Sequence, residues 1–304
     1  MSEYMKSNKM VSIIMTCHNG EAFLYEALRS IIDQTYLNWE LIFFDNFSKD
    51  RSKEIVNRFK DNRIKYFKTD VLENLGTVRK LAYSKCNGSF ICFLDVDDYW
   101  SKFKLEKQII KFDSNEKIDA VYSNHSKILD NEINENKQNF VRGNIIDEII
   151  KSYIDGSPLT PWLTLMIKKS SIEKLEYSFD NETHISSDFD LILRLSIFCY
   201  FDYVNENLAY YRLHINNESK NKKKNIEEFV YIIHKYEKNK IISKLFLYKN
   251  FLYKIYLKYF IIKKLHLDSF ESFKIINNFN VKLLYYGIKI IPNRILNIFF
   301  KSLC

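Results

Sequence analysis

Short runs of β-branched and aromatic residues alternate with helical patterns over the first 125 residues, and this alternation constrains the fold more than any other feature. The pattern predicts strands at residues 11–16, 40–45, 63–67, 90–95 and 119–124. It predicts helices near residues 22–34, 51–60, 78–86 and 102–112. Such an order implies an α/β domain whose mostly parallel central sheet is flanked by helices on both faces.

The remainder of the chain falls into three stretches. Residues 126–160 are polar and poorly periodic, and we expect the segment NEINENKQN (131–139) to be mobile. A second structured region follows, with an apolar run at 162–167, a helical pattern at 188–198 and a strand-like run at 208–213. Beyond the lysine run Lys222–Lys224, residues 226–304 have a helical pattern rich in Phe, Tyr, Ile and Lys.

Composition narrows the class of protein and its compartment. The chain is 46% hydrophobic and has only six Gly and three Pro, which argues against a disordered chain. Its five cysteines are odd in number and scattered, so we expect neither a disulfide framework nor a structural zinc site, and the cytosol is the expected location. The first ten residues lack a signal-peptide core, and no stretch reaches the roughly 18 apolar residues of a membrane span.

Charge divides the chain into an acidic and a basic part. Residues 220–304 contain 18 Lys and Arg against 5 Asp and Glu, a net charge of +13, whereas residues 1–219 carry −5. Lysines at 244, 249, 254, 258 and 263 do not fall on one face of a helical wheel. Two interpretations of the basic part therefore stay open: peripheral binding to the anionic inner face of the plasma membrane, and a packed helical pair.

Three carboxylates occupy four positions directly after the strand predicted at 90–95. Asp95, Asp97 and Asp98 lie at the carboxyl end of that strand, where open α/β sheets bind ligands. Because like charges this close repel one another, a divalent cation among them is one interpretation, and oxygen ligands favour Mg²⁺ or Mn²⁺. The other interpretation is that Asp97 and Asp98 cap the helix that follows.

The surrounding motifs carry a resemblance to a known family. The segments VSIIMTCHNGEAFLYEALRSIIDQTYLNWELIFFDNFSKDRS (11–52) and NLGTVRKLAYSKCNGSFICFLDVDDYW (74–100), followed by SSDFDLILRL (186–195) and YRLHINNES (211–219), together resemble glycosyltransferase family 2. This resemblance implies the GT-A fold and an inverting mechanism. It implies a nucleotide-sugar-binding half at residues 1–125 and an acceptor-binding half at 126–219, with 220–304 as a helical basic extension outside the resemblance.

The resemblance also implies a donor site. Its residues are Thr16, His18, Asp45, Asn46, Arg79 and Asp95. His18 stands where the family places an aromatic side chain that stacks on the nucleotide base, and Asn46 departs from the commoner acid. UDP-sugar is the favoured donor, and dTDP-sugar is the alternative.

The metal ligands and the general base follow from the same resemblance. Asp97, with Asp95 and His214, would bind Mn²⁺ or Mg²⁺, and Asp188 matches the aspartate that acts as the general base. The residue before it, Ser187, stands where the family has glutamate. The implied acceptor is a hydroxyl of a glycan or a lipid-linked glycan precursor.

Two other classes of function are alternatives to a glycosyltransferase. A nucleotidyltransferase of the same fold needs a Gly-rich, arginine-containing loop after the first strand, whereas this chain has Thr16-Cys17-His18-Asn19-Gly20. A non-catalytic polyanion binder would use the basic segment, but its aromatic residues are interleaved with Ile and Leu, as in a packed helix. We therefore expect no nucleic-acid partner.

The charge division gives a first prediction. A chain that ends near Lys220 should lose affinity for anionic vesicles, and the intact chain should be released as salt rises, because each surface cation contributes about 1 kcal/mol at a charged leaflet. Co-sedimentation with vesicles at several salt concentrations measures both effects. An insoluble truncated chain, together with an intact chain that does not bind vesicles, would show that the segment is core.

Overall fold

The computed structural model describes residues 9–130, 132–135, 140–154 and 158–215, and scattered residues between 217 and 236. The chain divides into two compact units, residues 1–215 and residues 216–304, and the elements named below belong to the first. Residues 237–304, which hold most of the predicted helical extension, lie outside the described residues, as do residues 131 and 136–139 of the segment expected to be mobile.

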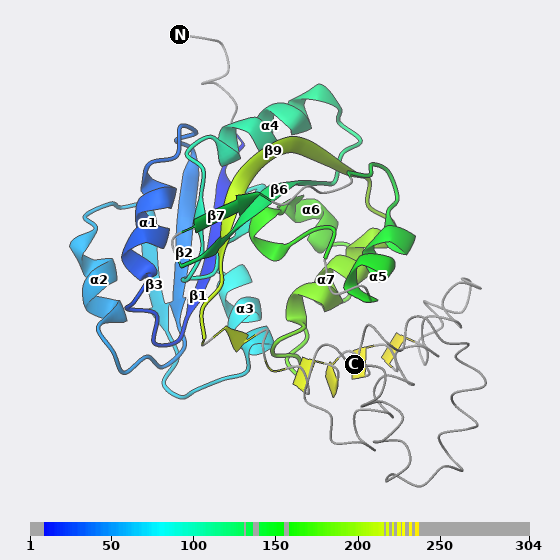
Figure 1. Ribbon diagram of the computed structural model, residues 1–304. Helices are drawn as coiled ribbons and strands as arrows, with labels where there is room; N and C mark the ends of the chain where they lie inside the picture. The colour runs from blue at the N-terminus through cyan, green and yellow to red at the C-terminus, as the bar shows by residue number, and fades with distance from the viewer. Residues whose placement is uncertain are drawn as a thin grey trace, which may run out of the picture. The chain divides into compact units, whose positions relative to one another are not determined.

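Strands and helices alternate along the first unit, as the sequence predicts (Figure 1). The first half contains β1 (Val11–Cys17), α1 (Leu24–Ile32), β2 (Trp39–Asp45), α2 (Ser52–Arg58), β3 (Ile64–Lys68), α3 (Leu75–Tyr83), β4 (Phe90–Phe93), β5 (Tyr99–Trp100) and α4 (Lys104–Ser114). The second half contains β6 (Ala120–Leu129), β7 (Glu132–Glu135), α5 (Ile146–Ile154), the 3₁₀ turn η2 (Trp162–Thr164), β8 (Met166–Lys168), α6 (Lys169–Ile172), α7 (Ser187–Ser196) and β9 (Phe201–Arg212).

The described strands form one nine-stranded sheet in the order β3-β2-β1-β4-β8-β6-β9-β5, with β7 paired to β6. Strands β3, β2, β1 and β4 run parallel, which confirms the predicted arrangement of the first half. Beyond β4 the sheet becomes mixed, because β8 pairs antiparallel with both β4 and β6, whereas β6 and β9 run parallel. Strand β6 therefore does not follow β4 in the sheet, and β8 separates the two halves.

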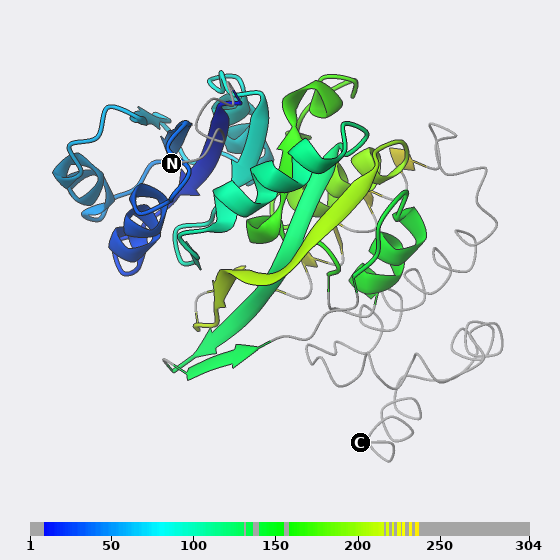
Figure 2. The same ribbon diagram turned by 90° about the horizontal axis from the view of Figure 1, so that it is seen from above.

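The central strands are buried on both faces because their residues alternate between two hydrophobic cores. In β1, Ile13 packs into the core that includes α1 and α4, whereas Ile14 packs into the core that includes α3 and α7. Phe43 and Phe44 of β2 divide between the cores in the same way. Figure 2 shows helices on both sides of the strands.

One buried acid on this sheet is held by several partners. Glu40 of β2 is only 3% exposed, and it accepts hydrogen bonds from the Ser12 hydroxyl (2.6 Å) and the Asn87 backbone (2.6 Å) and pairs with Lys65 (2.5 Å). Burial raises the pKa of Glu40, but these partners outweigh it and lower the pKa to about 2. The carboxylate thus stays ionised within the sheet and ties β2 to its neighbours.

Residues 126–160 are more ordered than their composition indicates. Strand β6 continues to Leu129 and pairs with β7, so residues 132–135 of the segment expected to be mobile form a strand. Helix α5 was not predicted, although its region has the apolar spacing of an amphipathic helix. Ile145 and Ile149, four positions apart, are both fully buried in the second core. Tertiary packing therefore orders parts of a stretch that is polar and poorly periodic in sequence.

The start of α3 packs against the segment that leads into α7. Gly76 donates from its backbone to the Thr183 carbonyl oxygen (3.0 Å), and the Leu75 backbone donates to Nδ1 of His184 (3.1 Å). A Cβ atom on Gly76 would lie 2.0 Å from the Asp180 carbonyl oxygen. Because that neighbour is backbone, only glycine allows this close approach.

Replacement of Gly76 by alanine should therefore destabilise the first unit. The added methyl group must displace the backbone at Asp180, and overpacking of this kind costs about 1–3 kcal/mol of unfolding free energy. Chemical denaturation of Gly76→Ala against wild type measures the effect, and Lys80→Ala, at an exposed position of the same helix, is the matched control. Equal stability of both variants would contradict the close packing.

Candidate active site

The carboxyl ends of β1 and β2 place the predicted base-binding residues next to one another. Cys17 and Asp45 are register partners, so the chain leaves both strands at the same edge of the sheet. His18 is exposed, and its Nδ1 atom lies 2.8 Å from the Asn46 carbonyl oxygen. Thr16, one residue inside β1, is half-buried. The Nε2 atom of His18 lies 3.1 Å from Nδ2 of Asn19. Both contacts are at the ring nitrogens, so the face of this exposed imidazole stays available for stacking.

Asp45 and Asn46 are both buried and hydrogen-bonded. The Asp45 carboxylate accepts from the Ser48 backbone (2.8 Å) and from the Tyr66 hydroxyl (2.6 Å), and burial together with this carboxylate raises the pKa of Tyr66. The Asn46 amide donates to the Glu73 carbonyl oxygen (2.9 Å) and accepts from the Glu73 backbone N–H (3.0 Å). A carboxylate cannot donate, so this double contact gives a structural reason for Asn at position 46.

The acidic loop after β4 meets the end of β9. The Nε2 atom of His214 lies 2.8 Å from Oδ2 of Asp97, across a separation of 117 residues in the sequence. Both side chains are partly exposed, Asp97 at 24% and His214 at 21%. The structure thus brings together two of the three residues that the sequence predicted as metal ligands, and it places Asp95 in the same short loop.

Asp98 differs from the other two acids of the loop because it is only 2% exposed. It accepts a hydrogen bond from the Arg212 backbone (2.9 Å), and Nε of Arg212 donates to the Asp97 carbonyl oxygen (3.0 Å). Burial, and then the nearby carboxylates of Asp97 and Asp95, raise the pKa of Asp98. Asp98 therefore fixes the loop to β9, so neither helix capping nor metal binding describes its contacts.

Arg212 is a residue of the site that the sequence analysis did not single out. Its guanidinium pairs with Glu26 of α1 and lies 4.8 Å from the centre of the Phe23 ring. Phe23 in turn packs against the ring of His214, with 5.0 Å between the ring centres. The Tyr-Arg-x-His pattern contained the signal, because Arg212 and His214 leave β9 two positions apart.

Arg79 of α3 joins the acidic loop after β4 to the start of α7. Its side chain is 6% exposed, lies 3.6 Å from Oδ1 of Asp95, and donates a hydrogen bond to the Ser187 hydroxyl. The guanidinium carbon also lies 4.7 Å from the centre of the Trp162 ring. Arg79 is therefore a buried bridge between the acidic loop and the residue that precedes Asp188.

Asp188 lies in the first turn of α7 and is half-buried. Its Oδ1 atom accepts from the Phe189 backbone (2.8 Å). Asp190, two positions later, is fully buried and forms an ion pair with Arg194 (2.6 Å). Of the two acids, Asp188 is partly exposed whereas Asp190 is fully buried.

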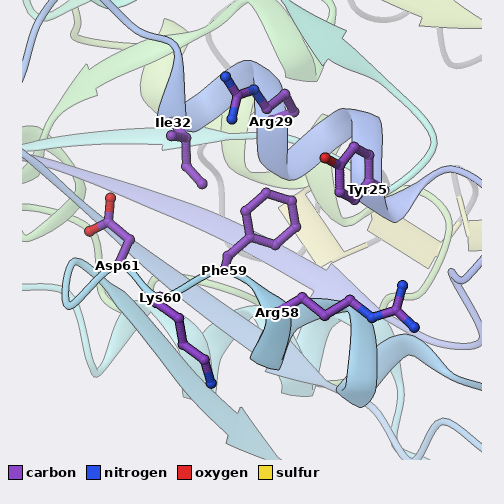
Figure 3. Close-up of a pocket in the computed structure, with 7 residues that line it drawn as sticks. All are labelled: Tyr25, Arg29, Ile32, Arg58, Phe59, Lys60 and Asp61. Atoms are coloured by element: carbon purple, nitrogen blue, oxygen red, sulfur yellow. The ribbon is translucent and has the colours of Figure 1, made fainter.

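The described part of the chain also has a pocket away from these residues. It is lined by α1 and by residues 58–61 at the end of α2, with Tyr25, Ile32 and Phe59 in its apolar part (Figure 3). Arg29, Arg58 and Lys60 point in different directions around it (Figure 3). None of the predicted site residues lines this pocket, and its cations do not converge on one ligand position.

Comparison with known proteins identifies the family. The GT-A fold that the resemblance implies is confirmed by the solved structures described below, which share the fold of this chain. The sequence model of glycosyl transferase family 2 matches residues 12–175, more than half of the chain. The chain therefore belongs to glycosyl transferase family 2. Membership favours the transferase interpretation over the nucleotidyltransferase and the polyanion binder.

Curated relatives in this family are bacterial glycosyltransferases. The chain is 38% identical over 124 residues to the Escherichia coli UDP-Glc:alpha-D-GlcNAc-diphosphoundecaprenol beta-1,3-glucosyltransferase WfgD, which covers 41% of this chain and 49% of WfgD. It is 31% identical over 102 residues to the putative teichuronic acid biosynthesis glycosyltransferase TuaG of Bacillus subtilis, covering 33% of this chain and 40% of TuaG. The matches thus span about half the length of these relatives or less.

Two solved structures show the same fold at low sequence identity. S. aureus TarS 1-349 in complex with UDP-GlcNAc has a TM-score of 0.62 and 16% identity, covering 84% of this chain and 73% of TarS 1-349. The mannosyltransferase PcManGT of Pyrobaculum calidifontis, in complex with GDP-Man and Mn²⁺, has a TM-score of 0.58 and 13% identity, covering 82% and 71%. Within the residues that the structure describes, no helix is both long and apolar enough to cross a membrane.

Proposed function

We propose that this chain is a metal-dependent inverting glycosyltransferase, which moves a sugar from a UDP-sugar to a hydroxyl of a lipid-linked glycan precursor. The observation that carries the proposal is the contact between Asp97 and His214 at the carboxyl ends of the parallel strands. It forms a partly exposed carboxylate–imidazole pair beside the loop that holds Asp95. Such a pair suits a nucleoside diphosphate with its cation.

The donor assignment rests on the chemistry at the ends of β1 and β2 and on the relatives. His18 would stack on the base, Asp45 and Asn46 would line the base position with Thr16, and Asp95 would contact the ribose or the metal. UDP is preferred to dTDP because WfgD is named as a UDP-Glc transferase and TarS was solved with UDP-GlcNAc. The name of WfgD also gives the acceptor class, a diphosphoundecaprenol-linked sugar.

The residues present fit Mn²⁺ or Mg²⁺ only together with substrate. Among the described residues, no group of three or more His, Cys, Asp or Glu side chains could hold a metal ion. Mg²⁺ is commonly bound by one or two carboxylates, substrate phosphates and water, so Asp97, with Asp95 and His214, would complete such a set. When bound, the ion neutralises the charge of the departing diphosphate.

Asp188 is the proposed general base. Its carboxylate accepts the proton of the acceptor hydroxyl while the hydroxyl oxygen attacks the anomeric carbon. The bond between that carbon and the diphosphate oxygen breaks in the same displacement, so the configuration inverts. The half-buried position of Asp188 at the start of α7, with Oδ1 held by the Phe189 backbone, fixes the carboxylate.

The remaining parts of the proposal concern domain roles and location. Residues 1–125 would bind the donor and residues 126–219 the acceptor. A cytoplasmic location, with the basic segment 220–304 on an anionic membrane surface, agrees with the charge of that segment.

Loss of Asp97 should weaken metal-dependent nucleotide binding. In calorimetry with Mn²⁺, Asp97→Ala should bind UDP at least about tenfold more weakly than wild type, because a charged ligand of the cation is lost. In EDTA the two proteins should bind UDP alike. Asp33→Ala, which breaks an exposed ion pair with Arg29 on α1, is the matched control. The assignment would be wrong if wild type bound UDP as tightly in EDTA as it does with Mn²⁺. It would also be wrong if Asp97→Ala bound UDP with wild-type affinity in the presence of Mn²⁺.

Replacement of Asp188 by asparagine distinguishes two possible roles of this residue, a general base and an acid that only stabilises the helix terminus. An Asn side chain can still accept from the Phe189 backbone, but it cannot take the acceptor proton, so turnover should fall roughly 10²–10⁴-fold. UDP affinity and melting temperature should stay near wild type. Steady-state transfer assays, calorimetry and thermal unfolding measure the three quantities.

Asp190→Asn is the contrast, since it makes the same chemical change two positions along α7. Its buried ion pair with Arg194 should weaken, so the melting temperature should fall. Normal transfer by Asp188→Asn would rule out Asp188 as the base. Loss of both transfer and UDP binding would mean that the residue shapes the site and transfers no proton.

A further inference from the structure

Arg79 is a charged side chain in the interior that contacts two segments distant in sequence. Its guanidinium donates to the Ser187 hydroxyl, across a separation of 108 residues, and pairs with Asp95 at 3.6 Å. Trp162 lies against its face at 4.7 Å. A guanidinium has several donors in a rigid planar fork, so one side chain can hold two partners in a fixed relative position.

The helix that carries Arg79 is itself fixed to the segment before α7. The backbone of Gly76 and Leu75 donates to Thr183 and His184, and the absence of a Cβ on Gly76 permits this approach. Arg79 lies one turn further along α3, on the same side as Gly76. Two successive contacts of α3 therefore lead to Ser187, the first residue of α7.

Asp188 lies close to this bridge. Burial raises the pKa of the Tyr153 hydroxyl well above its ordinary value. The Asp188 carboxylate adds to this increase, and the Arg79 guanidinium partly offsets it. Both charges thus act on the same phenol, which stands beside Phe189 with 4.4 Å between ring centres. The cation of Arg79 and the carboxylate of Asp188 therefore both lie near the buried hydroxyl of this half-buried tyrosine.

We propose that Arg79 is a positioning residue that holds the turn bearing Asp188 in register with Asp95, and that Ser187 is the group through which it acts. This inference rests on the proposed function, because it needs Asp188 to be the base. Arg79 then has a different role from the predicted binding of the sugar donor, because its N–H groups contact protein side chains on both sides of the site.

The serine at position 187 suits this role. In the motif that Ser187-Asp188 resembles, the first residue is glutamate, and a carboxylate there would neutralise the Arg79 guanidinium. A hydroxyl accepts the hydrogen bond without adding a charge, so Arg79 keeps its full attraction for Asp95. Loss of the hydroxyl should therefore release the turn that carries Asp188 and leave the ion pair with Asp95 in place.

The test is Ser187→Ala, with Ser187→Thr as the conservative variant. Ser187→Ala should lower kcat for sugar transfer about tenfold or more, the loss expected for one hydrogen bond to a charged group, with KM for UDP-sugar and Kd for UDP within about twofold of wild type. Ser187→Thr keeps a hydroxyl and should restore most of kcat. Ser196→Ala is the matched control: it removes a buried hydroxyl of the same helix that donates to Leu193, and it should transfer at the wild-type rate.

A double-mutant cycle identifies the partner. Arg79→Met should lower kcat and also weaken UDP binding, because Asp95 loses its cation, and adding Ser187→Ala should lower kcat no further. Arg79→Lys is measured in parallel in case Arg79→Met does not fold. The lysine ammonium can hold only one of the two partners at full strength. The kcat of Arg79→Lys should therefore be lower than that of wild type.

The outcomes separate this inference from the proposed function. Wild-type kcat in Ser187→Ala, with loss of activity in Asp188→Asn, overturns the positioning role alone. Additive effects of the Arg79 and Ser187 variants also overturn it, since independent residues would then be acting. Normal transfer by Asp188→Asn overturns the base assignment, and the inference with it.

Discussion

Strands β1, β2 and β4 are buried on both faces. A polar side chain within them therefore needs a buried partner, and polar residues are otherwise expected near or beyond the ends of the strands. Glu40 is a charged residue within β2, and contacts with Ser12, Lys65 and Asn87 keep it ionised. The polar groups of the candidate site lie near the carboxyl end of a strand or directly after it. Because the three strands are parallel and adjacent, those groups collect at one edge of the sheet, and the candidate site is the result.

Two side-chain bridges connect that edge to the second half of the unit. One runs from Asp97 and Asp98 to His214 and Arg212 at the end of β9. The other runs from Asp95 through Arg79 to Ser187 at the start of α7. Each bridge joins groups more than 100 residues apart and involves partly or fully buried charges. In the proposed function, where one half binds the donor and the other the acceptor, such links would fix the position of the sugar donor relative to the general base.

Several residues assigned to ligand binding also have structural partners. The Asn46 amide holds Glu73, and the Asp45 carboxylate holds Ser48 and Tyr66. These contacts hold the residues around the proposed nucleotide-base position, which would reduce the ordering that ligand binding must achieve. A residue in this site therefore acts both as part of the fold and as a candidate ligand. Substitutions here need a stability measurement beside each activity measurement.

The sequence by itself determined the alternating order, the parallel first half and the loop acids, because strand periodicity and the position of Asp45 and Asp95 after apolar runs are local properties. The motif resemblance also assigned Asp97 and His214 the same role, that of metal ligands. Only the tertiary structure decided that β8 separates β4 from β6, that α5 is a helix, and that Asp98 and Ser187 accept hydrogen bonds from Arg212 and Arg79. Those features depend on contacts between segments far apart in the chain, and no local pattern encodes which buried charge finds which partner.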